Sequence, residues 1–232
     1  MIRLLCCLLF LVTATTSQID QKKLTGQYPN PKNLLEVETL TAFKLMKAAA
    51  AKDGINLTVV SGYRSFTRQT QIWNRKYKKY AAQGLEPDAI FDKIVEYSTV
   101  PGTSRHHWGT DIDIIDTNAT YSGSVLVPSK FHGNGPFCKL KDWMEKHSAT
   151  YDFELVYTMN DNRTGFKYEP WHYSYVPLSR KRYNDYLKTI DLVTFLRSEN
   201  IMGMDKISEE RINRYLVEHI KGVNPKLKDG FK

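Results

Sequence analysis

The sequence lacks an apolar run long enough to cross a membrane. Its most apolar stretch, residues 4–12, is too short to span the roughly 30 Å of hydrocarbon in a bilayer as a stable helix. Arg3 precedes this stretch and small residues follow it as far as Ser17, an arrangement typical of a secretory signal peptide. We therefore expect residues 1–17 to be removed. The mature protein should be exported, to the periplasm or outside the cell, with no stable membrane insertion.

Cysteine is scarce, with three residues in a chain of 232. Cys6 and Cys7 lie within the apolar stretch, which leaves Cys138 in the mature chain. An exported protein with a single cysteine has no internal disulfide, so its stability must come from a hydrophobic core. We expect the Cys138 thiol to be buried and not to act as a nucleophile.

Clustered basic tracts of the kind that bind nucleic acid are also absent, although the formal net charge is +8. The lysines and arginines are spread along the chain, and export separates the protein from nucleic acid. An anionic cell envelope is the simpler counterpart for this charge. The chain has no internal repeat and no low-complexity tract, and its length suits one main domain, which we expect to be a monomer.

What is present is a periodicity that predicts an α+β fold. An alanine-rich helix over residues 35–52 ends before Gly54, and a second helix follows its N-cap Ser65 and ends before Gly84. The other predicted elements are a strand over 55–60, a strand over 110–115, a helix after Pro136, a hairpin of residues 153–159 and 166–176, and at least two helices in 178–232.

These elements divide the chain into four consecutive parts. The signal peptide is followed by a polar N-terminal arm, residues 18–34, which should be poorly ordered unless it is tied down. The main domain then covers residues 35–178, and a helical C-terminal extension covers residues 179–232.

Two short segments, residues 104–113 and 169–172, concentrate imidazole and carboxylate groups. A catalytic zinc site takes three ligands from such groups and keeps a fourth position for water. Peptide hydrolysis also needs a carboxylate that moves protons, and Glu169 can fill that role. The helical His-Glu-x-x-His motif is absent, which excludes a zincin-type peptidase.

The predicted strands place these groups on particular faces. Asp111 and Asp113 share one face of the strand over 110–115, opposite the core face. Glu169 and His172 are three residues apart, so a regular strand would point them to opposite faces. A twist or bulge is needed to aim both at one site, and Pro170 suits such an irregularity.

The spacing Ser104-x-His106-x-x-Gly109-x-Asp111-x-Asp113, followed by Glu169-x-Trp171-His172, resembles the paired motifs of the VanY-type D-Ala-D-Ala metallopeptidases. This family is related to lysostaphin and to the hedgehog signalling domain. Residues 61–65, SGYRS, resemble the family's substrate-binding segment, and the likeness covers roughly residues 35–178. It implies an antiparallel sheet flanked by helices, with zinc in a cleft on the sheet. The implied reaction is hydrolysis of the terminal D-Ala-D-Ala bond of peptidoglycan stem peptides.

The resemblance also implies residue roles by matching position. It implies that Glu169 is the catalytic base and that Arg64 also acts in catalysis. It implies the zinc ligands His106, Asp113 and His172, and the substrate-binding residues Arg64, Gln69 and Ser104.

One position departs from the family pattern, which usually has alanine where this chain has Asp111. The departure leaves open whether Asp111 or Asp113 binds zinc, and Asp111 could instead orient a histidine. His107 should point away from its neighbour and form a cleft wall or lie on the surface. His132, His147 and His219 are expected in ordinary surface or helix-packing positions.

Three functions remain open at this point. The first is a carboxypeptidase, in which Arg64 and Ser104 hold the terminal carboxylate of the stem. The second is an endopeptidase that cuts within the stem or a cross-bridge. The third is a zinc-bearing binding module without turnover, which the presence of Glu169 disfavours because a structural zinc site needs no base.

Overall fold

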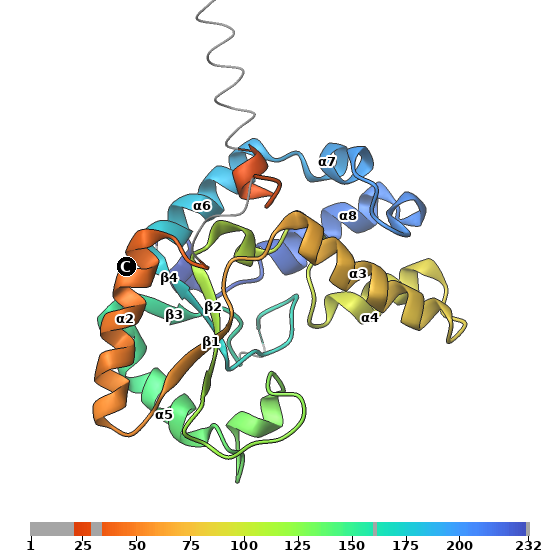
Figure 1. The fold of residues 1–232 in the computed structure, drawn as a ribbon. Coiled ribbons are helices and arrows are strands. Elements are labelled where there is room, and N and C mark those ends of the chain that lie inside the picture. Colours follow the sequence, from red (N-terminus) through yellow and green to blue (C-terminus); the bar gives the residue numbers. More distant parts are fainter. Residues whose placement is uncertain (1–20, 29–33, 160–161, 231–232) are drawn as a thin grey trace, which may run out of the picture.

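The computed structural model describes residues 21–28, 34–159 and 162–230. Four strands form one antiparallel sheet in the order β1-β2-β4-β3: β1 Leu57–Ser61, β2 Asp111–Asp116, β3 Phe153–Leu155 and β4 His172–Tyr175. The predicted α+β class with an antiparallel sheet flanked by helices is confirmed (Figure 1).

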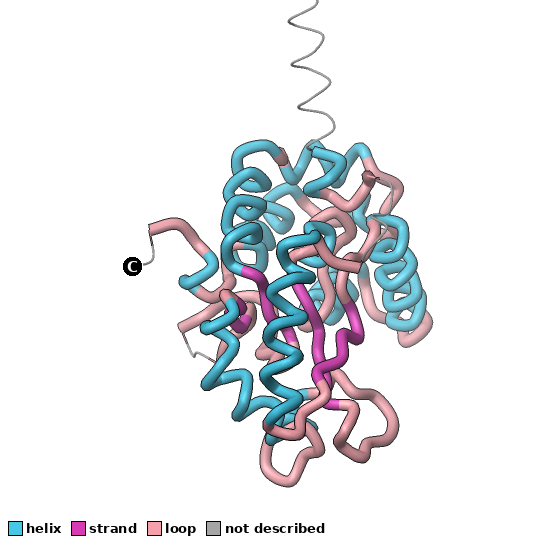
Figure 2. The backbone as a smooth tube through the Cα atoms, turned by 60° about the vertical axis from the view of Figure 1, so that its left-hand side comes forward, coloured by secondary structure: helices cyan, strands magenta, loops and turns pink. Residues whose placement is uncertain are grey.

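One face of the sheet is covered by α2, Val37–Lys52, and α5, Cys138–His147 (Figures 1 and 2). Met46 of α2 and Met144 of α5 are fully buried with Ile112 and Ile114 of β2 in one hydrophobic cluster. Because side chains alternate along a strand, Asp111 and Asp113 lie on the opposite face. That face is left for polar chemistry.

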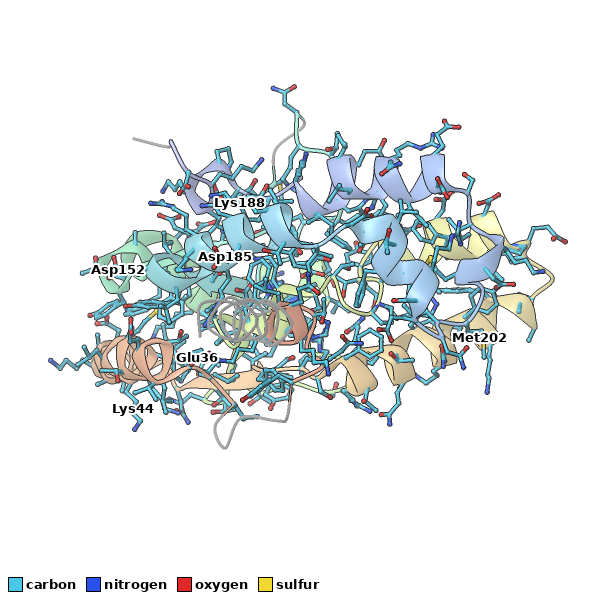
Figure 3. All side chains as sticks on the ribbon, turned by 90° about the horizontal axis from the view of Figure 1, so that it is seen from above. Glu36, Lys44, Asp152, Asp185, Lys188 and Met202 are labelled. Atoms are coloured by element: carbon cyan, nitrogen blue, oxygen red, sulfur yellow. The ribbon has the colours of Figure 1, made fainter. Side chains whose placement is uncertain are left out.

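The remaining helices form a second hydrophobic cluster beside the sheet. These helices are α3 Phe66–Ala81, α4 Pro87–Val95, α6 Val176–Thr189, α7 Leu192–Ser198 and α8 Glu209–Tyr215. Trp73 of α3 is buried in this cluster together with Tyr186 and Tyr215. The Trp73 indole donates a hydrogen bond to the Met202 carbonyl at 2.9 Å; Met202 is labelled in Figure 3. Residues on both sides of the expected boundary at 178 therefore share one core.

Short helical turns complete the order of elements. They are the 3-10 turns η1 Arg105–Trp108, η2 Pro128–Phe131, η3 Ser148–Tyr151, η4 Met204–Lys206 and η6 Pro225–Leu227, and the π turn η5 Leu216–Ile220. Helix α4 was not predicted from the sequence. Its start is marked by Pro87 in the first helical turn, a position that proline favours.

Most predicted elements are confirmed, but the hairpin is shorter than expected. Ser65 caps α3 by accepting a hydrogen bond from the Arg68 amide. The hairpin is reduced to β3 and β4, and residues 166–171 are irregular backbone with a turn at 170–171 rather than a strand. Pro170 lacks the amide hydrogen that a ladder needs, so pairing starts only at His172.

The N-terminal arm is tied down where it is described. Leu24 is 2% exposed, and its carbonyl accepts a hydrogen bond from the Trp108 indole. The Phe66 amide donates to the Gly26 carbonyl at 2.8 Å. The expected signal peptide lies outside the described residues. Across the ranges that the structure describes, every helix is too short or too polar to span a membrane.

Cys138 differs from expectation in its burial. It lies at the start of α5 and is half-buried, with its thiol donating to the Gly133 carbonyl at 3.3 Å. The apolar face of α5 is carried instead by Leu140, Trp143 and Met144.

Candidate metal centre

Three side chains from two distant segments converge on the polar face of the sheet. Ligand atoms of His106, Asp113 and His172 all lie within 4.8 Å of one another, and all three residues are buried. The strand register explains two of them, because Asp113 of β2 lies directly opposite His172 of β4 and such pairs share a face. These three residues could hold a metal ion.

His106 reaches the group from the turn η1, which precedes β2. Gly109 ends this turn with φ 67°, in the left-handed region that glycine tolerates best. The His106 carbonyl accepts a hydrogen bond from the Arg64 amide at 3.0 Å, which ties the turn to the end of β1. The two imidazole rings then lie side by side, with centroids 4.6 Å apart.

Each histidine has one ring nitrogen against an oxygen on the far side of the group and the other turned toward Asp113, and this second nitrogen of His172 also lies 3.0 Å from Glu169 Oε2. Nδ1 of His106 lies 2.9 Å from the Gly62 carbonyl, and its Nε2 lies 3.3 Å from Asp113 Oδ2. Nε2 of His172 lies 3.0 Å from Asp111 Oδ2, and its Nδ1 lies 3.8 Å from Asp113 Oδ1. Metal-binding histidines are typically oriented in this way by an oxygen on the far nitrogen.

The two aspartates of β2 have opposite environments. Asp111 is fully buried, and its oxygens accept hydrogen bonds from Arg105 Nε at 2.8 Å, Thr110 Oγ1 at 2.9 Å and Ser174 Oγ at 2.6 Å. By contrast, Asp113 Oδ1 is buried and has no hydrogen-bond partner among the described residues. A buried carboxylate oxygen without a partner costs free energy, and a bound cation would satisfy it.

The electrostatics of the group favour a positive charge. Burial opposes the charged ring of His172, but its hydrogen bonds to Asp111 and Glu169 and the charge of Asp113 prevail and raise its pKa to about 10. Burial also opposes the charged form of Asp113, yet the charge of His106 lowers the pKa of this carboxyl overall. The site thus stabilises a cation at its centre, and its nitrogen and oxygen donors suit zinc.

Glu169 lies at the edge of the group, and a turn brings it there. The His172 amide donates to the Glu169 carbonyl at 3.1 Å, which folds residues 169–172 back on themselves. Glu169 Oε2 therefore lies 3.0 Å from His172 Nδ1, although a regular strand would have separated these side chains. The irregularity expected around Pro170 is this turn.

Arg64 is held beside the same group. Its guanidinium donates to Gln69 Oε1 at 3.1 Å and Ser61 Oγ at 2.8 Å, and it lies 3.6 Å from Asp113 Oδ2. Gln69 is fully buried, and its amide also donates to the Thr99 carbonyl at 2.7 Å. Gln69 does not line the cavity over the group. We therefore infer that it positions Arg64 rather than contacting the substrate.

A cavity of about 440 Å³ opens over the group. Arg64, Ser104 and Glu169 line it, as the sequence predicts for substrate-binding and catalytic residues. The sequence did not single out Lys76 and Tyr157, which also line it. Lys76 could have been found from its spacing of seven residues after Gln69, which places both on one face of α3. No feature of the local sequence singles out Tyr157. Its ring packs edge-on against His172, with ring centroids 5.1 Å apart.

His107 does not line this cavity, but it forms part of the wall of a smaller cavity of about 200 Å³, together with Lys23 and Tyr63. It is 2% exposed, with Nδ1 2.5 Å from the Arg64 carbonyl and Nε2 accepting from the Gly102 amide at 3.1 Å. Burial lowers its pKa to about 3, so the ring is a neutral link between two loops. His132 pairs with the Tyr168 hydroxyl at 3.2 Å, and the His147 ring lies tilted against Trp143 with ring centroids 4.9 Å apart.

Several curated proteins are similar in sequence. A D-alanyl-D-alanine carboxypeptidase of Enterococcus faecalis is 32% identical over 55% of this chain and 43% of its own length. YodJ of Bacillus subtilis, a putative carboxypeptidase by name, is 30% identical over 62% of this chain and 47% of that protein. The chain thus spans less than half the length of these two relatives. An uncharacterised Haemophilus influenzae protein is 30% identical over 51% of this chain and 93% of its own length.

Solved structures share the fold. A mutant of the vancomycin resistance D,D-pentapeptidase VanY, in complex with Zn(II), has a TM-score of 0.50 and 21% identity over 78% of this chain and 83% of that chain. The LdcB LD-carboxypeptidase has a TM-score of 0.50 and 26% identity over 70% of this chain and 73% of that chain. The family model described as "VanY: D-alanyl-D-alanine carboxypeptidase" matches residues 32–178, and the chain therefore belongs to this family of carboxypeptidases.

Proposed function

We propose that this protein is a zinc carboxypeptidase that removes the terminal D-alanine from peptidoglycan stem peptides ending in D-Ala-D-Ala. The observation that carries the proposal is the convergence of two imidazole nitrogens on the unpartnered Asp113 carboxylate, with Glu169 beside them. Family membership and the D-alanyl-D-alanine carboxypeptidase of Enterococcus faecalis support the substrate class. The Zn(II) of the VanY mutant structure supports the metal.

In this proposal His106, Asp113 and His172 hold the ion, and Asp111 orients His172 from the far side. A bound zinc supplies Lewis acidity, which polarises the scissile carbonyl and acidifies the attacking water. Asp111 is the poorer ligand candidate because four protein donors already occupy its two oxygens.

The chain's own groups carry the proton and the developing charge. Glu169 accepts the proton of the attacking water and then passes it to the leaving amine of D-alanine. Arg64, fixed by Gln69 and Ser61, donates hydrogen bonds to the carbonyl oxygen as that oxygen gains negative charge. Ser104 adds a hydroxyl at the cavity wall.

Export follows from the same proposal, because the substrate lies outside the cytoplasm. The signal peptide over residues 1–17 remains a prediction of the sequence. N-terminal sequencing of the mature protein tests it, and an N-terminus at residue 1 would contradict it.

The decisive experiment is mass spectrometry of purified muropeptides before and after treatment with the zinc-loaded protein. Loss of one alanine residue from pentapeptide stems, abolished by chelation, is the expected result. Loss of the last residue from tetrapeptide stems alone would favour the L,D activity that the LdcB likeness suggests. Cleavage inside the stem would favour an endopeptidase, and unchanged muropeptides would favour a binding module.

A further inference from the structure

Three basic side chains line the cavity, and two of them already have partners. Arg105 is 5% exposed and pairs with Asp111 and Ser174. Arg64 is held by neighbouring oxygens, as described above. Lys76 is half-buried, and within the described ranges its ammonium makes no hydrogen bond and no ion pair. Arg105 Nη1 also lacks a hydrogen-bond partner, but among the described residues Lys76 is the cavity cation whose charged group makes neither a hydrogen bond nor an ion pair.

The position of Lys76 along α3 separates it from Arg64. Gln69, which holds Arg64, lies seven residues earlier, so about 10 Å of helix axis lies between their backbones. Helical side chains tilt toward the N-terminal end, and for Lys76 this is the end that meets the metal group. Lys76 thus lines the cavity from α3 (labelled in Figure 1), about two helical turns along from the residue that holds Arg64.

The surroundings of Lys76 favour an added anion. Burial lowers the pKa of Lys76. The negative charge of Glu169 raises this pKa only in part, and the positive charges of Arg75 and Arg64 lower it further. A desolvated ammonium is unfavourable without a hydrogen-bonded anion beside it. A carboxylate brought by the substrate would supply that anion and be recognised at the same time.

We propose that Lys76 binds the free terminal carboxylate of the stem peptide. The inference rests on the proposed carboxypeptidase function and concerns the specificity of the same site. The terminal carboxylate lies one residue beyond the scissile carbonyl, a reach of about 3.5 Å along an extended chain. Arg64 lies 3.6 Å from Asp113, beside the group that would hold the metal, and in this proposal it meets the scissile carbonyl while Lys76 takes the carboxylate. This assignment replaces the expectation that Arg64 and Ser104 hold the terminal carboxylate.

The test compares a stem pentapeptide with its C-terminal amide, using kcat/KM for each. The wild type should prefer the free acid by about tenfold to a hundredfold, the usual range for a charge-assisted hydrogen bond. Lys76→Met, which keeps an unbranched side chain of similar length without the charge, should lower kcat/KM on the acid by that factor and leave the amide unchanged. Lys76→Arg should restore much of the preference.

Two controls separate this inference from the proposed function. Lys78→Met removes an exposed lysine of the same helix and should behave as the wild type. Arg64→Lys should slow both peptides alike. A Lys76→Met protein that keeps the wild-type preference, or a preference lost in Arg64→Lys instead, overturns the role of Lys76 and leaves the carboxypeptidase intact. A wild type that hydrolyses neither peptide removes the proposed function and this inference together.

Discussion

Asp111 and Asp113 show how two identical side chains, two residues apart on one strand face, acquire different roles. Asp111 is buried, which opposes its charged form, but the charge of Arg105 and the hydrogen bond to His172 keep the pKa of its carboxyl well below the usual range. Asp113 faces the imidazoles and keeps one oxygen unpartnered within the described part of the chain. We infer that Asp111 stabilises the fold through its buried hydrogen bonds and that Asp113 is the metal ligand.

This difference predicts opposite effects of two substitutions. Asp113→Asn should empty the metal site, with little change in the unfolding free energy of the metal-free protein. Asp111→Asn should leave the Arg105 charge buried without its carboxylate, at a cost of about 3–5 kcal/mol. It should retain the metal with an affinity weakened about tenfold to a hundredfold. The metal content of the purified variants and their unfolding in denaturant measure these two effects. A site emptied only by Asp111→Asn would make Asp111, not Asp113, the metal ligand.

Glu169 is predicted to move protons rather than to bind the metal. Glu169→Ala should keep most of the zinc and lose about a hundredfold or more in kcat, the usual scale for a lost general base. His106→Ala is the matched comparison, because it should lose zinc and activity together. Zinc content of the purified proteins decides the point, and a zinc-free Glu169→Ala protein would make Glu169 a ligand.

Among the elements, α8 supports the loop that forms one wall of the cavity. The Tyr215 hydroxyl accepts from the Val100 amide at 3.2 Å and bonds to Thr103 Oγ1 at 2.8 Å. The Tyr186 hydroxyl of α6 donates to the Gly102 carbonyl at 3.1 Å. The C-terminal helices therefore fix a loop that ends at Ser104, immediately before η1, the turn that carries the candidate ligand His106.

Removing the Tyr215 hydroxyl should weaken this support. Tyr215→Phe leaves the buried Val100 amide unpaired, which should destabilise the protein by about 1–3 kcal/mol. Because the loop also borders the cavity, we expect a rise in KM with zinc content unchanged. Thermal unfolding and steady-state kinetics on a stem pentapeptide test this, and an unchanged stability would show that water satisfies the amide.

The C-terminal helices share one hydrophobic cluster with Trp108 of η1, the turn that also carries His106. His219 of η5 lies against this cluster, stacked on Tyr215 and edge-on to Phe166. Burial lowers its pKa to about 4, and the positive charges of Arg211 and Arg163 act in the same direction. Protonation of His219 is therefore coupled to unfolding of the chain.

The sign of this coupling gives a prediction for stability against pH. In the unfolded chain His219 takes up a proton near its ordinary pKa of 6.5, whereas in the folded protein it does so only near 4. Stability should therefore fall as the pH is lowered from about 6.5 toward 4. His219→Phe keeps the ring packing and removes the proton site, so the variant should lose less stability over this range. Melting temperatures near pH 7 and near pH 5 test it, with His147→Phe as a control.

The α+β class, most helices and the segments that carry the chemistry could be predicted without a structure. These features depend on local signals, such as the Ser65 cap and the alternation along β2, which neighbouring residues produce without distant contacts. The motif spacing also indicated Arg64, Ser104 and Glu169, all of which line the cavity.

The roles of those residues, by contrast, depend on the folded chain. The distinction between Asp111 and Asp113, the burial of His107 and the place of Gln69 behind Arg64 all follow from contacts that the fold creates. The charge of Lys76 inside the cavity depends on the same packing. Strand pairing and helix packing choose each residue's neighbours, and the neighbours set its hydrogen bonds and its charge state. The pattern along one segment carries no information about them.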